Sequence, residues 1–454
     1  MSGIPAQRVN IVGAGLAGAL LAVLLARRGF EVTLYERRPD PRSGRVERGR
    51  SINLALAARG IRALERAGLM DRVRPLLIPM RGRMVHEITG TPKLVPYGQR
   101  PEEVIHSVGR AALNLLLIEE VAKYPQVKLF FEHTCLGVRP EDDVLQIRED
   151  ATGRVFETAL TPTIATDGAG SAVRASLRAA GLLESREEPL GHDYKELTIP
   201  PVNGRHALDP NALHVWPRGG FMLIALPNTD GSFTATLFLA REGTPSFAAL
   251  RSSQDVRELF ATQFPDVVPL IPALLDEFRD HPQGQLGTVY AAPWRVGGKV
   301  ILLGDAAHAI VPFHGQGMNA AFEDCLELDL LLDRCEDWSS LFAELERRRK
   351  PNSDAIARMA LENYVEMRDT VRDPRFLRLK ALSLELERRH PDRFIPRYSM
   401  VMFHPEIPYA EALRRGAVQE RLLDEIDARA QAAGGTIDYD AADALIHEHL
   451  PPVG

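Results

Sequence analysis

Two short glycine-containing motifs lie far apart in the chain and have the composition of nucleotide-binding turns. The first covers Gly13–Gly18 (GAGLAG) and the second covers Gly304–His308 (GDAAH). Glycines in such a turn let the backbone approach a pyrophosphate closely, and the charge of the pyrophosphate is favourable at a helix N-terminus. The first motif therefore predicts a dinucleotide-binding turn.

The sequence around the first motif has the required order of elements. Residues Arg8–Val12 predict a strand, Leu16–Arg28 predict an Ala/Leu-rich helix, and Glu31–Glu36 predict a second strand that ends in an acid. Glu36 has the spacing at which a carboxylate accepts a hydrogen bond from a ribose 2′-hydroxyl. Because that acid would repel a 2′-phosphate, the expected resident nucleotide is FAD or NAD and not NADP. An ordinary turn and the core of a secretory signal are the alternatives, but no basic segment or A-x-A cleavage site frames the helix.

Composition favours a soluble globular protein. The 454 residues are 45% hydrophobic and 26% charged, with a net charge of −6, so no basic excess indicates nucleic acid. The three cysteines are too few for a disulfide framework and lack metal-ligand spacing, which suits a reducing cytoplasm. Outside the nucleotide helix no apolar run approaches the roughly 18 residues that a membrane span needs. We expect a cytoplasmic protein without a membrane span.

The order of predicted elements indicates an α/β fold with an inserted second domain. Residues 1–75, 107–175 and 291–330 are assigned to a discontinuous Rossmann-type nucleotide domain. Residues 76–106 and 176–290 are rich in strands separated by Pro, Asn and Gly, which predicts an antiparallel sheet. Residues 331–454 are helical and highly charged, and their run Arg347–Lys350 fits either an anionic partner or, more simply, a solvated helix face.

A third segment, Thr166–Arg174, follows a predicted strand and offers Arg174 for an anion. With the two opening motifs it resembles the FAD-dependent aromatic hydroxylases, which combine a Rossmann-type FAD domain with a β-sheet substrate domain. The resemblance implies that Asp305 contacts the ribityl chain and that Pro312–Asn319 surrounds the isoalloxazine ring. Negative charge on the reduced ring would be favourable at a helix N-terminus near Met318.

Further stretches resemble the kynurenine 3-monooxygenase family in particular. They are Gly49–Ala55, Val95–Gly98, Val311–Asp324, Glu362–Arg368 and Tyr398–Phe403. Eukaryotic members end in a membrane anchor, whereas this chain ends in a polar helical tail, so we do not carry membrane attachment over. The cofactor contacts that the nucleotide pattern and the resemblance imply are Gly13, Gly15, Leu16, Ala17, Gly18, Glu36, Arg37, Ala55, Arg110, Cys135, Asp305, Gly317, Met318 and Asn319. The implied substrate contacts are Arg83, Tyr97, Phe313, His314, Asn363, Met367 and Tyr398.

The chemistry of these residues agrees with an amino-acid substrate that carries an aromatic ring. Arg83 offers a planar fork for a carboxylate, although a surface arginine would look the same in the sequence. Asn363 lies within an apolar stripe of helical spacing, where an amide needs hydrogen-bond partners, and a core asparagine is the alternative. Tyr97 and Tyr398 are not diagnostic alone. His314 could relay a proton or only pack, so no catalytic residue is assigned.

The resemblance implies an FAD-dependent monooxygenase that uses NADPH and O2 to hydroxylate L-kynurenine to 3-hydroxykynurenine, a step of tryptophan degradation. Because the flavin supplies the oxidation chemistry, no acid/base pair is required. Within the same fold the alternatives are another aromatic hydroxylase or a flavin halogenase, whose lysine motif is not seen. A flavin-binding redox sensor is the alternative from a different class.

Overall fold

The computed structural model describes residues 3–5, 7–44, 53–370 and 373–453, so residues 49–52 of one family-like stretch lie outside the described residues. A six-stranded sheet carries the nucleotide motif, in the order β18-β19-β12-β1-β2-β8. Its strands are β1 (Arg8–Val12), β2 (Glu31–Glu36), β8 (Val127–Phe131), β12 (Thr163–Ala165), β18 (Arg295–Val296) and β19 (Val300–Leu302). All neighbouring pairs are parallel except β18 with β19. This arrangement confirms the predicted Rossmann-type fold.

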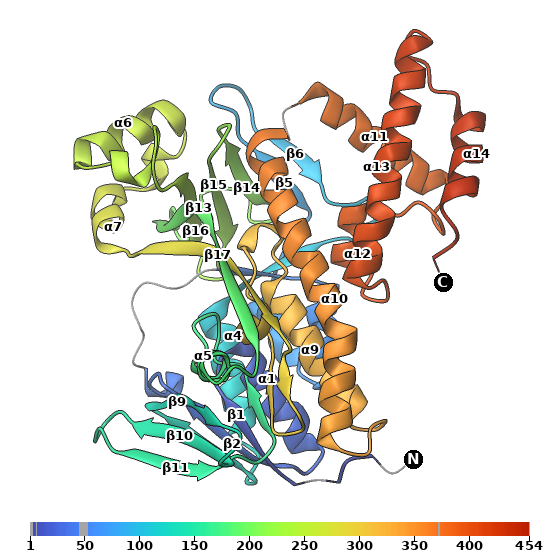
Figure 1. Ribbon diagram of the computed structural model, residues 1–454. Coiled ribbons are helices and arrows are strands. Elements are labelled where there is room, and N and C mark those ends of the chain that lie inside the picture. Colours follow the sequence, from blue (N-terminus) through green and yellow to red (C-terminus); the bar gives the residue numbers. More distant parts are fainter. Residues whose placement is uncertain (1–2, 6, 45–52, 371–372, 454) are drawn as a thin grey trace.

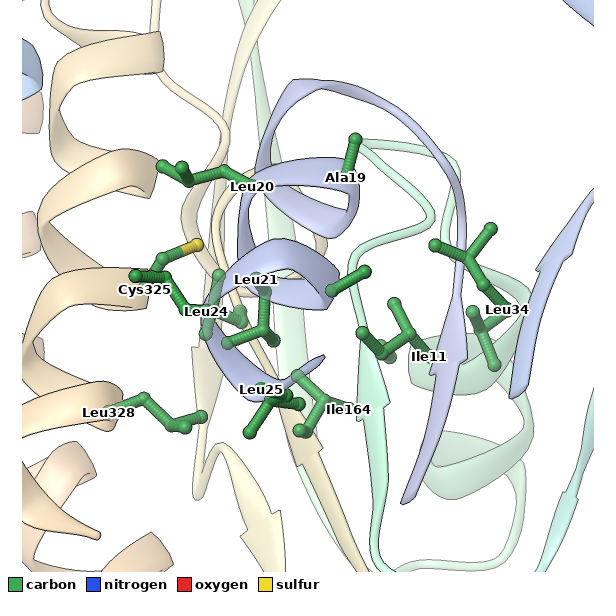
Figure 2. Packing of buried hydrophobic residues seen from close by; sticks show 14 of the residues in the cluster. Ile11, Ala19, Leu20, Leu21, Leu24, Leu25, Leu34, Ile164, Cys325 and Leu328 are labelled. Atoms are coloured by element: carbon green, nitrogen blue, oxygen red, sulfur yellow. The ribbon is translucent and has the colours of Figure 1, made fainter. Parts of the chain in front are cut away.

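Helix α1 (Leu16–Arg27) is apolar on all sides, and other elements cover both of its faces. Figure 2 shows Leu21 and Leu25 of α1 close to Ile164 of β12, and Leu24 facing Cys325 of the helix α9 (Gly317–Leu331). A helix that is hydrophobic all round is a buried helix, so the composition that resembled a signal peptide belongs to the core. The other helices of this half are α2 (Ala58–Arg66), α3 (Met70–Val73), α4 (Arg110–Val121), α5 (Ala172–Ala179) and α8 (Asp305–His308).

Two small antiparallel sheets were not predicted as sheets. One consists of β9 (His133–Arg139), β10 (Val144–Glu149) and β11 (Val155–Ala159), and it lies at the lower edge of the molecule in Figure 1. The other joins β3 (Asn53–Leu56), β7 (Ile105–Gly109) and β4 (Ile78–Met80). The chain passes through the second sheet between the nucleotide half and the upper half of the molecule.

A seven-stranded sheet forms the upper half, in the order β17-β13-β16-β15-β14-β5-β6. Its strands are β5 (Gly82–Val85), β6 (Lys93–Pro96), β13 (Glu184–Ile199), β14 (Leu213–Pro217), β15 (Met222–Pro227), β16 (Phe233–Ala240) and β17 (Gln283–Ala292). The sheet is antiparallel as expected except for the parallel pair β14–β5. Helices α6 (Ser253–Gln263) and α7 (Leu274–Asp280) pack with it around a separate apolar core. Because β17 crosses the predicted boundary at 290/291, the exact domain limits stay a prediction.

The C-terminal helices cover the edge of this sheet. They are the long α10 (Trp338–Val365), α11 (Pro374–Arg389), α12 (Arg397–Phe403), α13 (Tyr409–Ala432) and α14 (Tyr439–His449). Helix α10 continues into a π-helical turn, Glu366–Thr370. Short 3₁₀ turns lie at Pro41–Ser43, Arg74–Leu76, Phe247–Ala249, Val268–Leu270 and Pro312–His314. None of the helices in the described ranges combines the length and the apolar character that a bilayer crossing requires.

Candidate active site

The nucleotide turn between β1 and α1 requires glycine at two positions. Gly13 has a positive φ of 98°, and a Cβ atom there would lie 2.6 Å from the carbonyl oxygen of Thr166. A Cβ on Gly18 would lie 2.0 Å from the carbonyl oxygen of Gly13. Apart from chain neighbours, no atom of the described residues lies within 4 Å of a Cβ built on Gly15. The turn thus packs tightly on β12 and leaves open space before α1, which fits the pyrophosphate of a dinucleotide.

Glu36 ends β2 beside this turn. Its carboxylate accepts hydrogen bonds from the backbone N–H groups of Ala14 at 2.7 Å and Arg38 at 2.9 Å. An ionised carboxylate has about four acceptor positions, so capacity remains for ribose hydroxyls. Arg37 is exposed next to it. Asn114 of α4, which the sequence did not single out, donates to the carbonyl oxygen of Ala14 at 3.0 Å and lies one helical turn after the half-buried Arg110.

We expect Glu36→Ala to weaken FAD binding because a charge-assisted hydrogen bond to the ribose, worth roughly 1.5 to 3 kcal/mol, is lost. The affinity of the apoprotein for FAD, measured from the change in flavin fluorescence as FAD binds, checks this. Glu31→Ala is the matched control, because Glu31 begins the same strand and pairs with the exposed Arg8. Equal FAD affinity in parent, control and Glu36→Ala would remove the assignment.

Arg174, which the sequence offers for an anion, uses its hydrogen-bond donors within the protein. Its guanidinium donates to the carbonyl oxygen of Ala306 at 2.8 Å, to that of Ala169, and to the carboxylate of Glu187 at 2.9 Å. The side chain is only 3% exposed. Arg174 therefore connects the 166–174 segment to the second glycine motif.

Cys135 lies in β9 close to that segment. Burial, and next the negative charge of Asp167, raises the pKa of the Cys135 thiol to about 12. The thiol is therefore protonated at neutral pH. Its predicted contact with FAD would be that of a small neutral side chain.

The second glycine motif packs directly on the first. Gly304 has a φ of 58°, and a Cβ there would lie 3.0 Å from the Cβ of Ala321 and 3.8 Å from the Cβ of Ala17. Its N–H donates to the carboxylate of Asp324 at 3.2 Å. Asp305, the predicted ribityl contact, begins α8 and is exposed. The two motifs that are far apart in the sequence thus meet at one place.

A buried ion network underlies this turn. Asp324 accepts from His308 at 2.6 Å and from Arg349 at 2.7 Å, and these partners lower its pKa although burial opposes ionisation. Glu323 pairs with Arg349 at 2.6 Å and with Arg59 at 2.6 Å. The network joins α8, α9, α10 and α2 next to the second glycine motif, Gly304–His308.

Asn319 fixes the loop that the resemblance places around the flavin ring. Its amide oxygen accepts from Ala57 N–H at 2.9 Å, and its amide nitrogen donates to the carbonyl oxygens of Ala55 at 2.8 Å and Gly315 at 2.9 Å. Because both ends of the side-chain amide already form hydrogen bonds, Asn319 would contact FAD through its backbone. Gly317 and Met318 begin α9 at this point, as predicted, so a helix N-terminus faces the loop.

A cavity with an empty volume of about 820 Å³ adjoins this loop. Three groups line it: the loop Pro312–Gly315 with Ala55, the sheet residues, and the C-terminal residues Met367, Tyr398 and Met402. The sheet contributes Arg83 and Tyr97 together with apolar side chains such as Leu213, Met222 and Phe238. Six of the seven predicted substrate contacts line the cavity, and Asn363 lies directly behind Arg83.

Arg83 is the cation of this cavity wall and is held by the C-terminal helices. The guanidinium donates to Glu366 at 2.9 Å and to the side-chain oxygen of Asn363 at 3.2 Å. Asn363 donates in turn to the carbonyl oxygen of Phe313 at 2.7 Å. The Nε atom of Arg83 is buried and finds no hydrogen-bond partner among the described residues. Arg83 is 7% exposed and is therefore not the solvated arginine that the sequence also allowed.

Aromatic rings form a flat wall beside Arg83. Tyr398 stacks on Tyr97 with centroids 5.4 Å apart and on His314 with centroids 5.3 Å apart. Burial lowers the pKa of His314 to about 3, so its ring is neutral at physiological pH. Within the described part of the chain, the Tyr97 hydroxyl and His314 Nδ1 are buried without a hydrogen-bond partner. These two atoms fit a polar ligand in the cavity.

Two charged residues near Arg83 were missed. Glu366 begins the π-helical turn, and its place in the family-like stretch Glu362–Arg368 was the available signal. Lys380 of α11 donates to the carbonyl oxygen of Pro96 at 3.3 Å, and burial followed by the charge of Arg83 lowers its pKa to about 8. A single lysine in a charged helix gives no signal in the sequence.

Comparison with known proteins agrees with this geometry. The family model described as an FAD binding domain matches residues 6–358. The kynurenine 3-monooxygenase of Xanthomonas axonopodis pv. citri is 46% identical over 454 residues, covering 100% of this chain and 99% of the relative. That of Stenotrophomonas maltophilia is 47% identical, covering 98% and 97%.

Solved structures share the fold at lower identity. The p-nitrophenol 4-monooxygenase of Pseudomonas putida is 19% identical with a TM-score of 0.65, covering 85% of this chain and 94% of that one. The tetrameric 2-methyl-3-hydroxypyridine-5-carboxylic acid oxygenase is 19% identical with a TM-score of 0.63, covering 81% and 94%. The full-length similarity, together with the FAD-binding turn and the adjoining cavity, shows that the chain belongs to the kynurenine 3-monooxygenase family of FAD-dependent enzymes.

Proposed function

We propose that this chain is an FAD-dependent monooxygenase that uses NADPH and O2 to convert L-kynurenine to 3-hydroxykynurenine. The observation that carries the proposal is a buried arginine, Arg83, in an otherwise largely apolar and aromatic cavity. The loop Pro312–Gln316, which we call the flavin loop, contributes to the wall of this cavity. Such a site fits a ligand with one carboxylate and one flat ring.

The polar groups match the amino-acid end of L-kynurenine. The Arg83 fork binds a carboxylate through two parallel hydrogen bonds, and the Tyr97 hydroxyl adds a donor. Glu366 is the acceptor suited to the ammonium group. It already pairs with Arg83, so a zwitterion would extend an existing ion pair and leave no buried charge uncompensated.

The remaining residues orient the ring and exclude water. Reduced FAD with O2 supplies an electrophilic oxygen atom, and the ring amino group of kynurenine makes its ortho carbon nucleophilic. Phe313, Tyr398 and Met367 hold the ring in a low-dielectric slot. Neutral His314 contributes a hydrogen-bonding edge without a charge that would attract water. Asn363 joins Arg83 to the flavin loop through Phe313, which links substrate position to the loop.

We also propose a cytoplasmic location, because Cys135, Cys325 and Cys335 are all free thiols.

L-kynurenine should raise the rate of NADPH consumption by the purified holoenzyme, with most electrons recovered in hydroxylated product. Ring analogues that bind but cannot react should raise the rate and yield hydrogen peroxide instead. A panel of kynurenine, other aromatic amino acids and phenols, followed by NADPH absorbance and peroxide assay, checks this. A phenol that stimulates while kynurenine leaves the background rate unchanged would favour another aromatic hydroxylase.

A further inference from the structure

One residue of the flavin loop contacts the C-terminal helices directly. Pro312, Phe313, His314 and Gly315 line the cavity, whereas the next residue, Gln316, is fully buried and is not one of the lining residues. Its amide oxygen accepts from the Tyr409 hydroxyl of α13 at 2.7 Å. Its amide nitrogen donates to the sulfur of Met402 in α12 at 3.0 Å. Two separate helices therefore hold the end of the loop, immediately before α9 begins.

The donors and acceptors around Gln316 allow one orientation of its amide. A thioether sulfur only accepts hydrogen bonds, so a flipped amide would place its oxygen against the Met402 sulfur. Burial raises the pKa of Tyr409, so its hydroxyl keeps its proton and donates to Gln316. The favourable orientation places the amide nitrogen on the Met402 sulfur and the amide oxygen on the Tyr409 hydroxyl, which donates to it.

Tyr409 is itself held by the buried ion network next to the second glycine motif. The guanidinium carbon of Arg59 lies 3.9 Å from the centroid of the Tyr409 ring, and Tyr409 is fully buried. Arg59 pairs with Glu323 and also donates to the carbonyl oxygen of Ile407, which precedes α13. The position of the hydroxyl therefore depends on how α13 docks on the nucleotide half.

We propose that Tyr409 is a positioning residue for the reaction and acts through Gln316 to fix the loop that separates the flavin from the cavity. This inference rests on the proposed function, since it assumes that FAD occupies the site beside the loop. It makes the C-terminal helices contribute twice to the site. They hold Arg83, the cation proposed to bind the substrate, through Asn363 and Glu366. They hold the flavin loop through Tyr409 and Met402.

Tyr409→Phe tests the proposal because it keeps the ring under Arg59 and removes only the hydroxyl. In the holoenzyme we expect about fivefold weaker FAD binding, the effect of one lost buried hydrogen bond. We also expect an altered visible spectrum of the bound flavin and a larger share of NADPH ending as peroxide, with kcat falling more than KM rises. The matched control is Tyr439→Phe, since the Tyr439 ring also lies beneath an arginine, Arg389 at 4.9 Å, but in α14 and outside the cavity lining. The control should leave the flavin spectrum unchanged.

A double-variant comparison separates this role from a general loss of stability. In a Gln316→Met background, Tyr409→Phe should cause no further change in FAD affinity or spectrum. Additive effects, or a Tyr409→Phe enzyme with the FAD affinity, spectrum and coupling of the parent, would overturn the proposal. If Tyr409→Phe does not fold, Met402→Leu removes the other partner of Gln316 at similar volume and should change the spectrum in the same way. FAD affinity and spectrum need no kynurenine, so these measurements stand even if the proposed substrate is wrong.

Discussion

Arg83→Met should bind L-kynurenine roughly thirty- to several-thousand-fold more weakly than the parent enzyme. Truncating one side of a buried charge pair costs on the order of 2 to 5 kcal/mol, and about 1.4 kcal/mol corresponds to a factor of ten. FAD content should stay near that of the parent, because the nucleotide turn and the flavin loop lie on other elements. Titration of the flavin spectrum with kynurenine measures the dissociation constant directly. Arg83→Lys should recover only part of the affinity, because a point charge does not reproduce the fork.

Arg81→Met is the matched control for this experiment. Arg81 lies on the other side of Gly82 and is exposed, so its loss should leave kynurenine binding unchanged. Kynurenine without its α-carboxylate should bind the parent nearly as poorly as kynurenine binds Arg83→Met. If parent and variant discriminate equally between the two ligands, Arg83 does not contact the carboxylate.

Arg349→Met should lower the free energy of unfolding by about 3 to 5 kcal/mol, because it leaves two buried carboxylates without their shared cation. Arg349 pairs with Glu323 at 2.6 Å and Asp324 at 2.7 Å, and its side chain is 4% exposed. Asp324 also receives the N–H of Gly304, so FAD release on heating should shift to lower temperature with unfolding. Denaturant unfolding of the holoenzyme, followed by circular dichroism, measures the first effect, and heating followed by flavin fluorescence measures the second.

The neighbouring Arg347→Met provides the comparison. Arg347 lies on the same helix, is 70% exposed, and pairs with Glu344 at 2.7 Å. Exposed pairs of this kind contribute less than about 1 kcal/mol. Similar losses of stability in the two variants would mean that the buried network does not hold the flavin turn as described.

The nucleotide half could be predicted because its signals are local. The strand, glycine turn, helix and acid from Arg8 to Glu36 follow one another directly, and each has its own sequence pattern. The β9–β11 sheet was missed because its strands were not assigned from the sequence. The partners of Arg174, Ala306 and Glu187, could not be predicted because they come from elements that the sequence does not place beside it.

The prediction of the substrate half depended on the family resemblance more than on residue patterns. Arg83 meets Asn363 and Glu366 across 280 and 283 positions of sequence, and no local periodicity reports such a contact. The same holds for Tyr409 and Gln316, which are 93 positions apart. The π-helical turn at Glu366 changes the direction of the following side chains, and no helical stripe predicts where such a turn occurs.

The central claim is that the cavity holds L-kynurenine while FAD and O2 place an oxygen atom on its ring. Incubating the purified holoenzyme with NADPH, L-kynurenine and isotopically labelled oxygen gas tests this most directly, with mass spectrometry of the product. We predict 3-hydroxykynurenine that carries one labelled oxygen atom and forms in near-equal amount to the NADPH consumed. Unmodified kynurenine with all electrons recovered as peroxide, or a hydroxyl oxygen derived from water, would contradict the account.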